Sequence, residues 1–139
     1  MNCGVSGAKV RNRASVSEMV RKLVELGFAI HEPYSAVELS DEGRRLALAM
    51  VRRHRLLETF LVQELNYAWD EVHDEAELLE HTVSDTFIER LSAKLGYPDR
   101  DPHGDPIPDA HGAVDIPQAH QLASLDAGHT GRITRISDA

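Results

Sequence analysis

The fold is decided by a long amphipathic segment at residues 40–66, which reads SDEGRRLALAMVRRHRLLETFLVQELN. Ser40 and Asp41 can cap the start of a helix, because their side-chain oxygens accept hydrogen bonds from the free amides of the first turn. Apolar residues then recur at intervals of four or seven positions, which is one or two helical turns, and form one stripe: Leu46, Met50, Leu57, Leu61 and Leu65. We therefore predict one long helix over residues 42–66.

Two shorter helices are predicted after the long one. The first runs over residues 70–81, and the second begins at a capping Ser84 and stops at Gly96 and Pro98. Three such helices carry more apolar surface than they can hide from water. We therefore expect this helical unit, residues 41–98, to pair with a second copy as a homodimer.

The segment upstream of the long helix predicts part of a DNA-binding domain. A helix from Ser15 that ends at Gly27 is followed by two short alternating runs, residues 28–30 and 37–39, which predict a β-hairpin. A helix followed by such a hairpin is the second half of a winged helix-turn-helix. Residues 1–40 are therefore predicted to be a partial winged-helix domain.

The segments downstream of the helical unit predict a linker and a further module. Residues 99–118 are rich in Pro, Asp, Gly and His, which is typical of a linker. Residues 119–139 place Gly128 and Gly131 at a turn, with Ile133 and Ile136 in a strand after it. The predicted fold class is mainly α, with the wing and this terminal fragment as its β parts.

Composition and charge limit the function classes. The 139 residues carry a net charge of −8, which alone argues against binding to nucleic acid. However, residues 1–22 hold five basic groups and one acid, so one end suits phosphate while the acidic remainder suits cations. No apolar run is long enough for a membrane span and no secretory signal begins the chain, so we expect a cytosolic protein without a membrane partner. The single Cys3 cannot supply a thiolate cluster, so any metal site must use nitrogen and oxygen ligands.

The candidate metal ligands lie on two of the predicted helices. His73, Glu77, Glu80 and His81 are spaced by four, three and one, so they share one face of a helix. The long helix adds His54 and Glu58, one turn apart, and the six groups suffice for two cations. Imidazole and carboxylate without thiolate accept Mn, Fe(II), Co or Zn. The other histidines in the linker and tail are expected to be solvent-exposed: His103, His111, His120 and His129.

The motifs resemble those of the diphtheria toxin repressor and manganese transport regulator family. The resemblance rests on RRHRLLE at 52–58, VHDEAE at 72–77, EH at 80–81, LSDEGR at 39–44 and DPIP at 105–108. It covers about residues 15–108. It implies a dimeric winged-helix repressor that binds operator DNA when Mn(II) or Fe(II) fills a paired site.

Site residues follow from this resemblance. One metal site is implied for His54, Glu58 and His73, and another for Glu77, Glu80 and His81. The iron-responsive branch usually has cysteine at the position of Glu77, so a glutamate resembles the manganese-responsive branch. The DNA-contacting residues implied on the recognition helix are Ser15, Ser17, Glu18, Arg21 and Lys22. Residues 31–35 resemble the wing tip, and the tail resembles the first strands of an SH3-like or FeoA-like barrel.

The resemblance is incomplete at both ends. Members of the family begin with two further helices, the first of which contributes metal ligands, whereas residues 1–14 contain neither. We therefore expect a chain that dimerises and binds metal but binds operator DNA poorly. Two alternatives stay open: a metal-binding helical dimerisation module without DNA binding, and a dinuclear metallohydrolase, for which the sequence supplies no substrate pocket.

Overall fold

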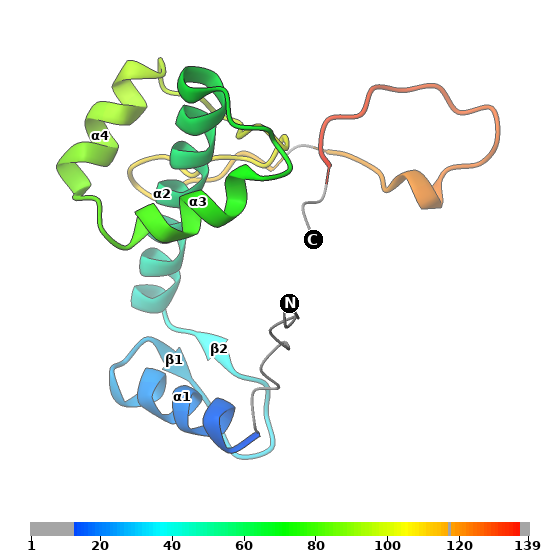
Figure 1. The fold of residues 1–139 in the computed structure, drawn as a ribbon. Coiled ribbons are helices and arrows are strands. Elements are labelled where there is room, and N and C mark those ends of the chain that lie inside the picture. The colour runs from blue at the N-terminus through cyan, green and yellow to red at the C-terminus, as the bar shows by residue number, and fades with distance from the viewer. Residues whose placement is uncertain (1–12, 117, 137–139) are drawn as a thin grey trace, which may run out of the picture. The chain divides into compact units, whose positions relative to one another are not determined.

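A mainly helical fold is seen in the computed structural model, which describes residues 13–116 and 118–136 (Figure 1). The chain divides into two compact units, Met1–Leu46 and Ala47–Ala139. In chain order the elements are α1 (Arg13–Glu25), β1 (Ala29–Ile30), β2 (Glu38–Leu39), α2 (Asp41–Leu65), α3 (Val72–Glu80), α4 (Asp85–Lys94) and the 3₁₀ helix η1 (Leu122–Ser124). The predicted order of helix, hairpin and three helices is confirmed.

The first unit is a helix followed by a small hairpin. Helix α1 ends at Glu25, and Gly27, two residues later, has a φ of +77°, a left-handed conformation that carries no steric cost for glycine. Strands β1 and β2 pair antiparallel, with Ala29 opposite Leu39. Ser40 then joins the hairpin to α2, because its hydroxyl donates to the Gly27 carbonyl at 2.6 Å and accepts from the Gly43 amide at 3.0 Å. The predicted cap at Ser40 is therefore present.

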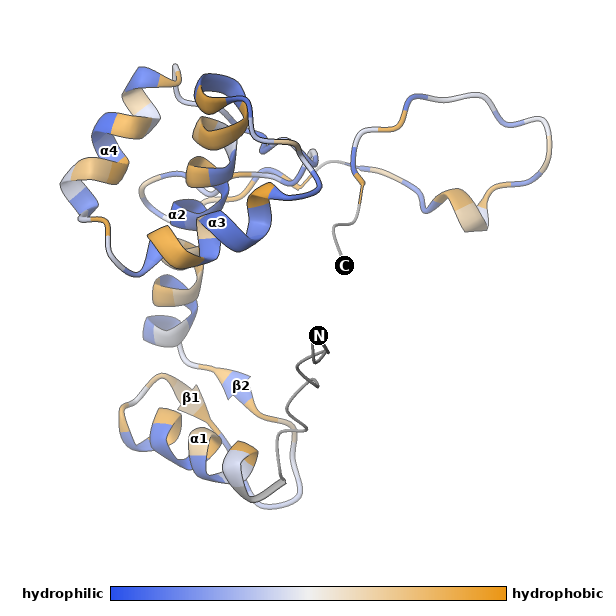
Figure 2. Cartoon of the chain, in the orientation of Figure 1, coloured by the Kyte–Doolittle hydropathy of each residue, from blue (hydrophilic) through white to orange (hydrophobic). Residues whose placement is uncertain are grey.

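The second unit has one apolar core between α2, α3 and α4. Figure 2 shows hydrophobic and hydrophilic residues alternating around these three helices, as expected for helices with one buried side. The core is built from Leu56, Leu57, Leu61, Val72, Ala76, Ile88, Leu91 and Ile107. It includes a residue from beyond α4, because Ile107 of the following loop is packed into it.

The helix ends follow from local hydrogen bonds. Ser84 caps α4, as predicted, by accepting a hydrogen bond from the Phe87 amide at 3.1 Å. Helix α3 begins at Val72, two residues later than predicted, because Glu71 and Ala68 form a turn between them. It ends at Glu80, which leaves His81 as the cap residue.

The segment expected to be a linker contains a packed loop at residues 99–109. Every second residue from Asp101 to Ile107 is buried, and Arg55 and Arg52 of α2 donate to the carbonyls of Pro106 and Pro108 at 2.5 and 3.0 Å. His103 is 4% exposed, so the expectation of a solvent-exposed histidine was wrong. Its burial follows from main-chain bonds across the loop, which no helical period could reveal.

The tail contains η1 and no strand within its described residues, 118–136. Ile133 and Ile136, which we predicted in a strand, are 72% and 49% exposed. A strand needs a neighbour to pair with through several main-chain hydrogen bonds. Within residues 118–136, a single main-chain hydrogen bond reaches another segment, from the Ile136 amide to the His103 carbonyl at 2.9 Å, and Arg135 adds an ion pair to Asp105 at 2.5 Å. Within the described residues, none of the helices is both long and apolar enough to span a bilayer.

Candidate metal centre

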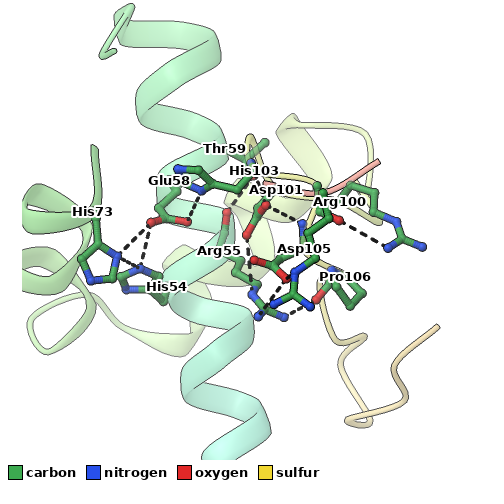
Figure 3. Close-up of polar contacts among 12 residues, drawn as sticks. His54, Arg55, Glu58, Thr59, His73, Arg100, Asp101, His103, Asp105 and Pro106 are labelled. Atoms are coloured by element: carbon green, nitrogen blue, oxygen red, sulfur yellow. Dashed lines mark hydrogen bonds and ion pairs between the residues drawn. The ribbon is translucent and has the colours of Figure 1, made fainter. Parts of the chain in front are cut away.

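Two imidazoles and a buried carboxylate meet between α2 and α3. The helical spacing of four places His54 and Glu58 on one side of α2, where His54 Nε2 lies 2.9 Å from Glu58 Oε1. His73 of α3 joins them, with Nδ1 3.3 Å from the same oxygen and 3.1 Å from His54 Nε2 (Figure 3). Glu58 is 1% exposed. The three residues predicted to share one site therefore lie together, and we call them the helical trio.

A chain of polar contacts extends from the helical trio to the end of α3. His54 uses its other ring nitrogen, Nδ1, to contact Glu80 Oε2 at 2.7 Å, and His81 Nε2 lies 3.3 Å from Glu80 Oε1. Glu77 is exposed on α3, and among the described residues it makes no hydrogen bond or ion pair that would link it to the cluster. Five of the six predicted ligands are therefore connected, and Glu77 is not.

A second group, which the sequence reasoning missed, shares Glu58 and lies on its other side. It consists of Glu58, Asp101 and His103, all buried, and we call it the loop trio. His103 Nδ1 is 3.7 Å from Glu58 Oε2, and Asp101 Oδ1 accepts from the amides of His103 and Asp105 at 2.9 and 2.8 Å. Figure 3 shows His103 and His73 on opposite sides of the Glu58 carboxylate. Each carboxylate oxygen of Glu58 thus belongs to a different trio.

The hydrogen bonding of His103 leaves one ring nitrogen pointing at a carboxylate. Its Nε2 lies 2.7 Å from the Trp69 carbonyl, which can only accept, so Nε2 carries a proton. In the neutral ring Nδ1 is then an acceptor; it is buried and has no hydrogen-bond partner among the described residues. Two facing acceptors in a buried place repel each other unless a cation or proton lies between them. A gap of 3.7 Å suits a divalent ion with bonds of about 2.1 Å to nitrogen and oxygen.

The electrostatics favour charged side chains in the helical trio but not at Asp101 of the loop trio. Burial alone would lower the pKa of His54, but the hydrogen bonds and charges of Glu58 and Glu80 outweigh it and raise that pKa. Burial would likewise raise the pKa of Glu58, but His54, His73 and His103 together lower it. For Asp101, burial dominates and raises the pKa. Glu58 is therefore held in its carboxylate form, which can bind a cation.

The residues expected to contact DNA lie apart from this centre in the sequence, on α1. Ser15, Ser17, Glu18, Arg21 and Lys22 are all exposed on that helix. Arg21 makes an ion pair with Glu25 at 3.7 Å, and both of these side chains remain mostly exposed. An exposed helix with basic side chains is the form that a recognition helix requires.

The fold and these clusters define a class: a helical metal-binding domain that follows a helix and hairpin of winged-helix type. The family described as the iron dependent repressor, metal binding and dimerisation domain matches residues 40–109, about half of the chain. The chain belongs to this family. The resemblance inferred from the sequence is therefore confirmed.

Known relatives agree with that membership. The chain is 38% identical over 94 residues to the iron-dependent repressor IdeR of Mycobacterium bovis, covering 68% of this chain and 41% of the relative. It is 36% identical over 107 residues to the diphtheria toxin repressor of Corynebacterium glutamicum, covering 77% and 46%. It is 62% identical, with a TM-score of 0.84, to a manganese-dependent transcriptional repressor solved in complex with manganese, covering 90% of this chain and 57% of that one.

The chain thus spans about half the length of the relatives that it matches. The relatives are transcriptional repressors rather than enzymes, so the metallohydrolase alternative is not supported.

Proposed function

We propose that this chain acts in a manganese-responsive transcriptional repressor, in which it supplies the metal-sensing and dimerising part and a recognition helix. The observation that carries the proposal is the placement of Glu58, whose two buried oxygens face His54 and His73 on one side and His103 on the other. A carboxylate shared in this way suits two divalent cations per subunit. A helical domain without metal has no need to bury so many acceptors.

Mn(II) is the metal that we propose, with Fe(II) as the alternative. The donors are imidazole nitrogens and carboxylate oxygens, which suit Mn(II) and Fe(II), and carboxylates provide the higher coordination number that separates Mn(II) from tetrahedral Zn(II). A repressor with 62% identity has been solved in complex with manganese. We also propose that Glu77, one turn before Glu80 and His81, turns inward when metal binds, so that these three residues add ligands at the helical trio.

The partner of the helical domain is proposed to be a second copy of the chain. The matching family is named for dimerisation, and large apolar side chains remain exposed on this unit: Leu78 is 71% and Phe87 is 43% exposed. Covering such side chains stabilises a dimer by about 25 cal/mol per Å² of apolar surface removed from water. Residues 41–98 are therefore the proposed dimerisation domain.

DNA binding is proposed to depend on metal through the dimer. Two recognition helices reach successive turns of the major groove only if the dimer holds them at the correct spacing. A metal that binds more tightly to the DNA-competent arrangement shifts the population toward it and acts as a corepressor. The proposed contacts are those of the exposed polar residues of α1, with residues 31–35 as the wing tip.

The segments that follow the loop at 99–109 complete the proposed organisation. Residues 110–118 would then connect the helical domain to residues 119–139, which we propose as the first part of an SH3-like or FeoA-like domain. The spacing of Gly128 and Gly131 and the hydrogen bond from Ile136 to His103 support this reading.

Mn(II) titration calorimetry on the full chain, combined with sedimentation, tests the sensor. We expect two ions bound per subunit and a dimer. Selection from a random duplex library, with and without Mn(II), then tests DNA binding, and Arg21→Ala should weaken the binding of any selected duplex while leaving the Mn(II) affinity unchanged. Absence of binding heat would refute the sensor. A normal titration without any selected duplex would instead refute DNA binding by this chain.

A further inference from the structure

Arg53 of α2, directly before His54, links α2 to the connection between α3 and α4. Its guanidinium nitrogen Nη1 donates to the carbonyls of Glu80 and Val83 at 3.0 and 3.1 Å, and Nη2 forms an ion pair with Asp85. Its side chain is 20% exposed, whereas that of Asp85 is 93% exposed. The bonds to the two carbonyls are therefore the protected part of this contact.

Glu80 is consequently held at two points by neighbouring residues of α2. Arg53 holds its main-chain carbonyl at 3.0 Å, and His54 holds its carboxylate at 2.7 Å. Because Glu80 is the last residue of α3, its carbonyl has no partner within that helix, and the helix end would otherwise fray. A fixed helix end also fixes His81, the next residue.

We propose that Arg53 is a positioning residue of the metal centre, which sets the end of α3 so that the carboxylate of Glu80 meets both His54 and His81. This inference rests on the proposed metal-sensing function. The donors of Arg53 are used by two carbonyls and Asp85, and no contact joins Arg53 to the carboxylate of Glu58 or Glu80 among the described residues. Arg53 therefore orders the ligands without competing with the metal for them.

The geometry explains why arginine occupies this position. A guanidinium is planar and presents several donors in fixed directions, so it can hold two carbonyls and a carboxylate at once. A lysine ammonium is a point charge that can reach one or two of these acceptors but cannot fix their relative directions. The positive charge also interacts favourably with the negative end of the α3 dipole, which lysine would preserve.

The test is a double-mutant cycle on the full chain, with Mn(II) affinity measured by titration calorimetry. Loss of a group that orients a metal ligand commonly weakens binding by about 10- to 100-fold, and we expect Arg53→Gln to fall in this range. Because Arg53 acts through Glu80, the same change in a Glu80→Gln background should cause almost no further loss. In a His103→Ala background, which alters only the loop trio, Arg53→Gln should still cause its full loss.

Three variants control for folding. Arg90→Gln makes the same substitution on an exposed part of α4 and should leave the Mn(II) affinity unchanged. Asp85→Asn removes only the exposed arm of the contact and should cost less than threefold, while Arg53→Lys should recover part of the affinity lost in Arg53→Gln. Thermal melts without metal identify a variant that does not fold. If Arg53→Gln does not fold, Arg53→Lys replaces it in the cycle, and its loss of Mn(II) affinity should likewise disappear in the Glu80→Gln background.

Two results would overturn the role of Arg53: unchanged Mn(II) affinity in Arg53→Gln, or a loss that is equally large with and without Glu80. If Glu80→Gln itself leaves the affinity unchanged, the ligand set of the proposed function is wrong, and the role of Arg53 falls with it. The two failures are therefore distinguishable.

Discussion

Replacing Glu58 with glutamine should remove most of the stabilisation that Mn(II) provides. The substitution keeps the shape of the side chain but removes the charge, and Glu58 contributes one oxygen to each trio. Both sites should therefore weaken together. Glu64→Gln is the matched control, because Glu64 is on the same helix but is exposed.

The expected magnitude follows from linkage. A metal at about 100 times its dissociation constant stabilises the folded state by about 2.7 kcal/mol per site, so two sites give about 5 kcal/mol. For a chain of this size, each kcal/mol of stabilisation raises Tm by roughly 4 °C, so two occupied sites should raise Tm by roughly 20 °C. If Glu58→Gln weakens each site about a hundredfold, about 0.4 kcal/mol per site remains and the shift falls below about 4 °C.

The assay is a thermal melt with and without Mn(II), in which each variant serves as its own reference. His73→Ala and His103→Ala each remove a ligand from one trio, so each should lose about half of the shift. Loss of the buried charge also lowers the stability of the metal-free protein by about 1–3 kcal/mol, which the melts without metal measure separately. If Glu58→Gln keeps more than half of the wild-type metal shift, a shared carboxylate is not the basis of the metal centre.

Three further predictions concern pH, Glu77 and Gly43. The raised pKa of His54 means that Mn(II) must displace a proton, so calorimetry should show affinity rising as pH increases through that pKa. Without metal, protonated His54 stabilises the folded protein because its pKa is higher there than in the unfolded chain. This stabilisation should be complete at low pH and decline as pH rises through the pKa of the folded protein, which a series of melts at different pH values measures. Glu77→Ala should leave the metal-free Tm unchanged but abolish the part of the metal shift that depends on Glu80 and His81, and an unchanged shift would exclude Glu77 as a ligand. Gly43→Ala places a methyl group 1.9 Å from the Phe28 carbonyl oxygen, so the first unit should lose more than about 1 kcal/mol, whereas an unchanged unfolding curve would show that the hairpin can move aside.

The sequence predicted the helices well because their signals are local. Capping residues such as Ser40 and Ser84 act within one turn, and the apolar stripe of α2 repeats over several turns. The pairing of His54 with Glu58 was also local, since four residues make one helical turn. These features depend on neighbours in the chain, which periodicity detects.

The position of Glu77 shows the limit of an argument from helical faces. Successive residues turn by about 100°, so Glu80 lies about 20° from His73 on one side and Glu77 about 40° from it on the other. His73 and Glu80 therefore both reach His54, whereas Glu77 points away. Shared spacing predicted one face, but only the packing of α3 on α2 selects which residues of that face meet.

The loop trio depends on contacts that no helical period reveals. His103 contacts Glu58 and the Trp69 carbonyl, which are 45 and 34 residues away in the sequence. One local signal was present and was not used: Asp101, His103, Asp105 and Ile107 alternate with Pro and Gly, a period of two that indicates one buried side. The high Pro and Gly content suggested a flexible linker, although the same residues make a tight, packed turn.

The neighbour of His103 gives the chain an optical reporter. Trp69 is the only tryptophan in the sequence, and its ring lies edge-on to the His103 imidazole with a centroid separation of 5.9 Å. Any ion held by His103 would sit beside this indole, and paramagnetic Mn(II) quenches nearby excited states. Occupancy of the loop trio can therefore be followed by intrinsic fluorescence, without a label.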